Sequence, residues 1–121
     1  MGGLSIVRSL TKTYRFSLHG FHCLEQLSEP LHGHSSFLKV TLRAPVSESL
    51  EAEFLAWIKK NILSDFHKQN WGKNLSGEPT GENVLSEIAL RFQSWKSEIA
   101  THIELEETPK NGFHLELMKF N

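Results

Sequence analysis

The fold is decided by the stretch TKTYRFSLHGFH (residues 11–22), in which apolar and polar side chains alternate. Tyr14, Phe16 and Leu18 fall on one parity, and the residues between them are mostly polar. A period of two is typical of a β-strand, because successive side chains of a strand point to opposite faces of the sheet. The stretch therefore predicts a strand that turns one face towards a core.

A second alternating stretch, HSSFLKVTLR (residues 34–43), follows closely and predicts the partner strand of a hairpin. After Pro45 the apolar residues recur at helical spacing, which predicts a helix over about residues 48–63. The polar connector that follows (residues 64–79) contains two glycines and a proline. It is too long for a bare turn, so we expect either a functional loop or a partly helical segment.

The second half of the chain predicts one more helix and one more hairpin. Thr80 is the expected N-cap of a helix that carries an apolar stripe from Val84 to Trp95. Residues 99–107 and the segment from Phe113 onwards alternate again, and the Pro/Asn/Gly loop between them is typical of a hairpin.

The order strand, strand, helix, helix, strand, strand predicts a single α+β domain over residues 1–121. Its four strands are expected to form one antiparallel sheet, with the helix pair covering the apolar face. A small sheet with exposed edges often pairs them with those of other copies, so we expect an oligomeric barrel.

Composition excludes several classes of protein. The chain has 121 residues, 39% of them hydrophobic, and its 13 basic and 14 acidic residues leave no positive surplus for nucleic acid. Cys23 is the one cysteine, which favours a reducing compartment over a disulfide-linked secreted scaffold. The N-terminal residues resemble neither a signal peptide nor a membrane span, so we expect a cytoplasmic protein with no membrane partner.

Histidines are the distinctive feature of the chain. There are seven, and four of them fall between positions 19 and 34. His32 and His34 share the parity of the apolar residues in the second strand, and His22 shares that of the first. Because the end of one hairpin strand lies beside the start of the next, these three imidazoles are expected to meet on one face.

Three neutral imidazoles with a fourth position left open are the usual arrangement of a catalytic zinc ion. The alternative is that the three side chains are hydrogen-bonded within an ordinary core, since a buried imidazole is costly unless its nitrogens are satisfied. His19 has the opposite strand parity and is a reserve ligand that would need a bulge at Gly20.

Four short motifs occur in a characteristic order along the chain: G-x-H-x-L (20–24), L-H-G-H (31–34), P-T-x-E-N (79–83) and E-T (107–108). In this combination the sequence resembles the 6-pyruvoyl tetrahydropterin synthase and 6-carboxytetrahydropterin synthase family over nearly its whole length. The resemblance implies the tunnelling fold, in which trimers form barrels that stack as hexamers. We therefore expect self-association to a trimer or a homohexamer.

The resemblance also implies roles for individual residues. His22, His32 and His34 match the family's zinc ligands, and the metal would polarise the side-chain hydroxyls of a dihydropterin. Glu107, followed by Thr108, matches the glutamate that anchors the pterin ring. Strand parity also turns Glu107 inward, and a carboxylate can accept two hydrogen bonds from an amino-pyrimidine edge.

The proton-transfer residues depart from the family pattern. Ser28 stands where the family usually has a proton-abstracting cysteine, and a serine hydroxyl is a much weaker acid than a thiol. Some members of the family use a glutamate, so Glu29 is a candidate base. The family's Asp-His pair aligns with Phe66-His67, and the aspartate stands one place earlier, at Asp65. A one-residue slip would restore a relay between Asp65 and His67; without it the relay is lost.

These observations leave three hypotheses. The first is a zinc-dependent lyase acting on 7,8-dihydroneopterin triphosphate, in the branch that supplies deazapurine (queuosine) biosynthesis. The second is a paralogue that binds zinc and a pterin-like ligand without the family's turnover. The third is a self-assembling structural protein whose histidines are ordinary, which a metal measurement would distinguish from the other two.

Overall fold

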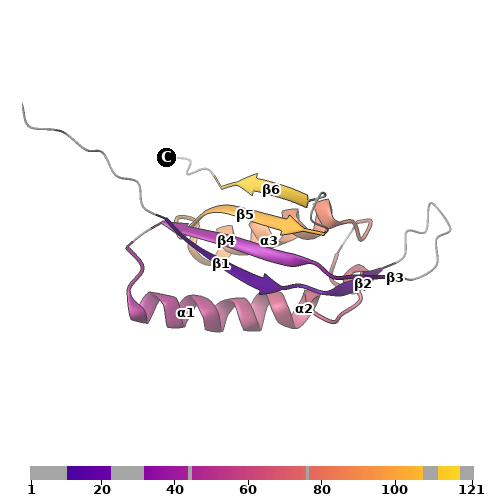
Figure 1. The fold of residues 1–121 in the computed structure, drawn as a ribbon, viewed down its shortest axis with the longest axis horizontal. Coiled ribbons are helices and arrows are strands. Elements are labelled where there is room, and N and C mark those ends of the chain that lie inside the picture. The colour runs from indigo at the N-terminus through magenta and orange to yellow at the C-terminus, as the bar shows by residue number, and fades with distance from the viewer. Residues whose placement is uncertain (1–10, 23–31, 44, 76, 108–111, 118–121) are drawn as a thin grey trace, which may run out of the picture.

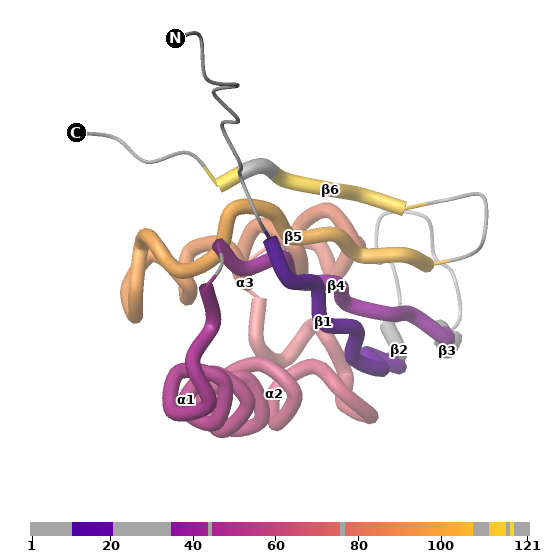
Figure 2. The backbone as a smooth tube through the Cα atoms, turned by 60° about the vertical axis from the view of Figure 1, so that its left-hand side comes forward, coloured from indigo at the N-terminus to yellow at the C-terminus, as the bar shows by residue number. Residues whose placement is uncertain are grey.

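The computed structural model describes residues 11–22, 32–43, 45–75, 77–107 and 112–117. At its centre lies a four-stranded antiparallel sheet in the order β1-β4-β5-β6, with helices on one face (Figure 1 and Figure 2). The strands are β1 (Thr11–Ser17), β4 (Phe37–Arg43), β5 (Ala100–Glu106) and β6 (Gly112–Glu116). This architecture confirms the predicted α+β fold and its order of strands and helices.

Each predicted strand of the first hairpin is divided in two. The first consists of β1 and a short β2 (Gly20–His22), and its partner consists of β3 (His32–His34) and β4. β2 and β3 pair with each other as a two-stranded ribbon. Figure 1 shows this ribbon continuing beyond one end of the four-stranded sheet. The sequence does not predict the division. It occurs at His19, which is hydrogen-bonded to His67 and Lys68 after the first helical run, and local spacing gives no sign of such a distant contact.

The pairing keeps one register across the division. Ser17 pairs with Phe37 on the sheet side, and Gly20 pairs with His34 on the ribbon side. Between them the Leu18 N–H donates to the carbonyl of Ser36 at 2.8 Å. No residue is inserted on either strand, so the alternation of faces continues from the sheet into the ribbon.

The first predicted helix is confirmed and extends three residues further than expected. α1 (Glu48–Ile58) begins after Ser47, whose Oγ accepts the N–H of Leu50 at 3.1 Å. A π-helical turn, η2 (Lys59–Leu63), and a short α2 (Ser64–Phe66) continue the same helical run.

The π turn matches the spacing of the apolar residues in this run. Its fully buried side chains recur every four positions: Phe54, Ile58, Ile62 and Phe66. An α-helix has about 3.6 residues per turn, so residues four apart are rotated by about 40° and a long row drifts off the buried face. The wider π turn, with its i→i+5 hydrogen bonds, reduces this drift. It therefore keeps the last two members of the row in the core.

The polar connector is partly helical and packs against the end of this run. Its 3-10 turn η3 (Trp71–Asn74) begins after Asn70, whose Oδ1 accepts the N–H of Gly72 at 2.9 Å. The Trp71 side chain is fully buried, and its indole N–H donates to the carbonyl of Phe66 at 2.8 Å. The connector is thereby tied to the C-terminal end of the first helical run.

The second long helix, α3 (Gly81–Lys96), begins where the sequence predicts it. The predicted N-cap Thr80 accepts the N–H of Asn83 at its Oγ1, at 3.2 Å. α3 packs on β5 and β6, and α1 packs on β1 through the Tyr14 and Phe54 rings, whose centroids lie 5.1 Å apart. The core fills the space between the sheet and the two helices. Among the described residues, no helix is long and apolar enough to cross a membrane.

Candidate functional site

The ribbon brings the three candidate histidine positions together. His22 pairs directly with His32, and Gly20 pairs with His34. Positions that pair across an antiparallel ribbon, and positions two apart on one strand, share a face. Because the register continues from the sheet into the ribbon, the three histidine positions have the same strand parity as the buried Leu18 and Leu38.

A tryptophan covers this face at Gly20. A Cβ built on Gly20 would lie 1.9 Å from Nε1 of Trp71, so the indole lies directly against the ribbon backbone. Trp71 was not predicted as a site residue. An isolated glycine within a strand pattern is the signal that could have indicated such a close approach.

Two buried polar atoms lie where the ribbon meets the sheet. Ser36 Oγ and His19 Nδ1 have no hydrogen-bond partner within the described part of the chain. Ser36 is fully buried and has the same strand parity as His34, two residues earlier. Buried hydroxyl and imidazole groups nearly always have partners, so these two atoms indicate a polar group that lies outside the described residues.

The predicted catalytic residue His67 contacts His19. His67 Nδ1 accepts the backbone N–H of His19 at 3.1 Å, and the ring centroids lie 5.5 Å apart. The next residue, Lys68, has a left-handed φ of 57° and donates its N–H to the carbonyl of His19. The turn after α2 is therefore fixed to the free edge of the strand at the point where β1 ends.

These contacts define the charge and the tautomer of His67. A ring nitrogen that accepts a hydrogen bond carries no proton, so the neutral His67 ring holds its proton on Nε2. Burial lowers the pKa of His67, and the neighbouring His19 and Lys68 lower it further. The side chain is thus a neutral hydrogen-bond donor at Nε2.

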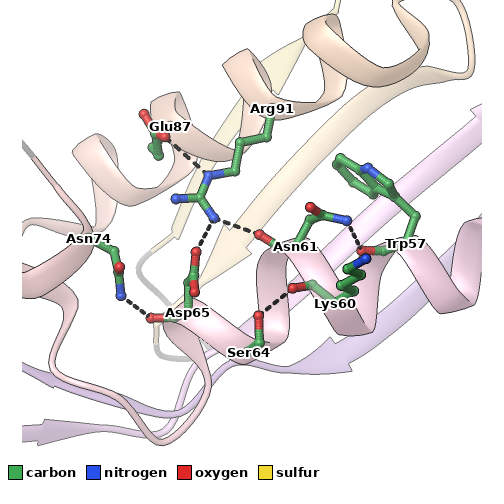
Figure 3. A network of polar contacts seen from close by, with 8 residues as sticks. All are labelled: Trp57, Lys60, Asn61, Ser64, Asp65, Asn74, Glu87 and Arg91. Carbon is green, nitrogen blue, oxygen red and sulfur yellow. Dashed lines mark hydrogen bonds and ion pairs between the residues drawn. The ribbon is translucent and has the colours of Figure 1, made fainter.

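Asp65 has a different partner. Figure 3 shows its carboxylate directed towards α3, where Oδ2 lies 2.6 Å from Nη1 of Arg91. The same Nη1 donates to the carbonyl of Asn61 at 2.6 Å, and Arg91 Nε donates to Glu87 at 3.1 Å. The two residues expected to form a relay, Asp65 and His67, therefore bind different groups in this structure.

A cavity of about 630 Å³ lies beside the Arg91 network. It is lined by side chains of the first helical run and of α3, and none of these comes from the ribbon. The Trp57 and Trp95 rings stack at one side of it, with centroids 4.4 Å apart. Because the Arg91 guanidinium is already paired with protein groups, we interpret this network as a clamp between the helices.

Glu107, the predicted pterin anchor, lies against the start of α3. It follows β5, and its Oε1 lies 2.2 Å from the point where a Cβ on Gly81 would be. The E-T and P-T-x-E-N motifs, about 25 residues apart in sequence, thus meet at the start of α3. Gly81 was not predicted as a site residue. Thr108 and Glu29 lie outside the described residues.

The candidate metal ligands can be placed only by the backbone register of the ribbon. Among the side chains that the structure describes, no three histidine, cysteine, aspartate or glutamate residues come together in a way that could hold a metal ion. The candidate set is therefore the one given by the β2–β3 pairing, namely His22, His32 and His34.

No protein-family model and no curated protein sequence matches the chain. Solved structures do match. 6-Pyruvoyl tetrahydropterin synthase from Caenorhabditis elegans is 21% identical, with a TM-score of 0.74 over 93% of this chain and 99% of that one. An uncharacterised protein from Wolinella succinogenes is 13% identical, with a TM-score of 0.67 over 91% and 99%.

Further matches come from Plasmodium. The 6-pyruvoyl tetrahydropterin synthase of Plasmodium falciparum is 13% identical, with a TM-score of 0.61 over 88% of this chain and 96% of that one. A Plasmodium vivax synthase, in which a glutamate described as a catalytic residue is replaced by alanine, is 11% identical, with a TM-score of 0.54 over 90% and 98%. The chain therefore has the tunnelling fold of the 6-pyruvoyl tetrahydropterin synthase structures, as its sequence motifs predict.

Proposed function

We propose that this protein is a divergent, zinc-dependent lyase of the 6-pyruvoyl and 6-carboxytetrahydropterin synthase family, acting on 7,8-dihydroneopterin triphosphate. The observation that carries the proposal is the register of the ribbon, which puts three histidine positions on one face. A fold shared with enzymes named for pterin chemistry supports the same substrate class.

The residues present fit a zinc ion. His22, His32 and His34 supply three nitrogen donors, a set that leaves one coordination position for substrate. The Ser36 hydroxyl has the same parity and no hydrogen-bond partner among the described residues, which supports a polar group bound there. Bound zinc would polarise the hydroxyls of the substrate side chain.

The pterin ring would bind at Glu107, with Thr108 beside it. A carboxylate accepts two parallel hydrogen bonds from an amino-pyrimidine edge, and such charge-assisted bonds are about twice as strong as neutral ones. Glu107 approaches the start of α3, whose positive dipole end attracts a negatively charged group.

Proton transfer is the least conventional part of the proposed mechanism. Ser28 replaces the usual thiol, so we assign Glu29 as the general base. The glutamate described as catalytic in the Plasmodium vivax relative supports a carboxylate in this role. His67 would hold its proton at Nε2 and donate it in a hydrogen bond, because Nδ1 is occupied by the His19 N–H.

A second candidate function is a paralogue that binds zinc and a pterin-like ligand without the family's turnover. The observation that favours it is the Asp65–Arg91 ion pair at 2.6 Å, which directs the aspartate away from His67. A site with metal and pterin groups but without a proton relay would bind its ligand and turn it over slowly.

For either candidate we propose a cytoplasmic protein that self-associates as a trimer or hexamer. β1 and β6 are the edge strands of the described sheet, and their unpaired backbone groups are suited to pairing with other copies. For the enzyme, the expected product branch is the one that leads to deazapurines such as queuosine.

The test combines a metal measurement with a turnover assay. Elemental analysis of the purified protein is expected to find about one zinc per chain, and none in the His32→Ala/His34→Ala variant. The matched control is His102→Ala/His114→Ala, which removes the histidine pair stacked at 5.3 Å on β5 and β6 and is expected to retain zinc.

The outcomes separate the candidates. Zinc together with consumption of 7,8-dihydroneopterin triphosphate supports the lyase. Zinc with pterin binding but no consumption supports the paralogue. Absence of zinc from the wild-type protein, or equal zinc in both histidine variants, rejects both.

A further inference from the structure

α3 begins with a glycine, Gly81, although the backbone conformation at this position does not require one. The φ of Gly81 is not positive, so any L-residue could adopt this backbone. Glycine also weakens a helix relative to alanine, because it loses more conformational freedom on folding. The reason for a glycine at this position must therefore lie in its surroundings.

The surroundings leave no room for a side chain. Gly81 is buried, and a Cβ built on it would lie 2.2 Å from Oε1 of Glu107 and 3.0 Å from Cε2 of Phe113. Ordinary contacts between such atoms are about 3.5–4.0 Å. The Glu107 carboxylate thus occupies the space that a methyl group at position 81 would fill.

The atom in severe conflict is the end of a flexible side chain, whereas the exposed Phe113 ring needs to give way by only a few tenths of an ångström. An alanine at position 81 would keep the helix and displace the carboxylate of Glu107, because rotating a glutamate costs less than moving α3. We propose that Gly81 is a positioning residue: its bare backbone lets the Glu107 carboxylate rest on the first turn of α3. That position is the one from which Glu107 binds the amino-pyrimidine edge of a pterin.

The choice of a pterin as the ligand rests on the proposed function, whereas the placement of Glu107 by Gly81 does not depend on it. Three substitutions separate the two. Gly81→Ala adds the conflicting methyl group, and Glu107→Ala removes the carboxylate. Gly77→Ala is the matched control, because the one described atom that a Cβ there would meet is Asn83 Nδ2, at an ordinary 3.6 Å.

The first measurement is the affinity for neopterin, a stable fluorescent pterin, determined by fluorescence titration of the full chain. Both Gly81→Ala and Glu107→Ala are expected to weaken binding by about tenfold or more, the loss typical of one charge-assisted hydrogen bond. Gly77→Ala is expected to bind like the wild type. In the Glu107→Ala background, Gly81→Ala is expected to cause no further loss, because its effect acts through Glu107.

The second measurement needs no ligand. The carboxylate ¹³C resonance of Glu107 is expected to move in Gly81→Ala and to stay in place in Gly77→Ala. The melting temperature of Gly81→Ala is expected to equal or exceed that of the wild type, since alanine favours the helix. A loss of affinity through misfolding would instead lower it.

The outcomes distinguish this inference from the proposed function. Wild-type affinity in Gly81→Ala, while Glu107→Ala binds weakly, overturns the positioning role and leaves the function intact. If the wild type does not bind neopterin, the proposed pterin site fails. The carboxylate resonance then decides the positioning role: movement in Gly81→Ala supports it, and an unchanged resonance overturns it.

Discussion

Replacing Gly20 by alanine is expected to destabilise the protein by forcing Trp71 away from the ribbon. The new Cβ would lie 1.9 Å from the indole Nε1, so the ring must retreat by about 1.5 Å or more to reach an ordinary contact. Trp71 is fully buried, and because protein cores are close-packed its ring can move only by displacing neighbouring groups. The retreat also breaks the 2.8 Å hydrogen bond from the indole to the Phe66 carbonyl.

The expected cost is the sum of these two effects. Overpacking of a filled core costs about 1–3 kcal/mol, and the lost hydrogen bond adds about 1 kcal/mol. We therefore expect Gly20→Ala to lower the free energy of unfolding by about 2–4 kcal/mol, a large part of the roughly 5–15 kcal/mol typical of a domain.

Urea denaturation followed by far-UV circular dichroism measures this loss. Gly77→Ala is the control, since its Cβ would make only an ordinary contact, and it is expected to change stability by less than about 0.5 kcal/mol. The cost of Gly20→Ala is expected to shrink in a Trp71→Leu background, where the conflicting ring is absent. A Gly20→Ala protein as stable as the wild type, or an equal cost in both backgrounds, would refute the contact.

Two further predictions concern the helices and the histidine turn. Arg91→Leu is expected to lower the free energy of unfolding by about 1–3 kcal/mol in urea, because the largely buried Arg91 guanidinium no longer joins Asp65, Glu87 and the Asn61 carbonyl. Lys96→Ala, which breaks an exposed pair, is expected to change it by less than about 1 kcal/mol; equal effects would contradict the clamp. The pKa of His67 is lowered by burial, so the unfolded chain takes up a proton at higher pH than the folded protein does. The stability that the neutral His67 contributes is therefore fully present above the ordinary histidine pKa of about 6.5 and is lost as the pH falls towards the folded-state pKa. His67→Gln is expected to lose less stability than the wild type between about pH 7 and pH 5; parallel losses would rule out the lowered pKa.

The elements of the fold were predictable because they depend on local spacing. Period-two alternation predicted the hairpin strands, and Thr80 predicted the start of α3. The four-residue spacing of Phe54, Ile58, Ile62 and Phe66 also contained a signal for the π turn, since a regular α-helix cannot keep such a row on one face.

The parts that were not predictable depend on contacts between distant segments. The division of the first hairpin coincides with two hydrogen bonds of His19, which donates its N–H to His67 and accepts that of Lys68, 48 and 49 positions further along the chain. The ion pair of Asp65 depends on how α3 packs against the first helical run, and Arg91 is 26 residues away. The meeting of Gly81 with Glu107 likewise depends on the packing of α3 against β5.

The π turn has a consequence for how this protein could change in evolution. It holds one residue more than an α-helical turn would, so a single deletion there would leave a regular helix with both ends intact. That deletion would rotate the following residues by about 100°, the angle per residue of an α-helix. Asp65 would then turn away from Arg91, and Phe66 would leave the core. The direction of the Asp65 side chain thus depends on the same helical register that packs Phe66 in the core. A deletion in the π turn would change both together.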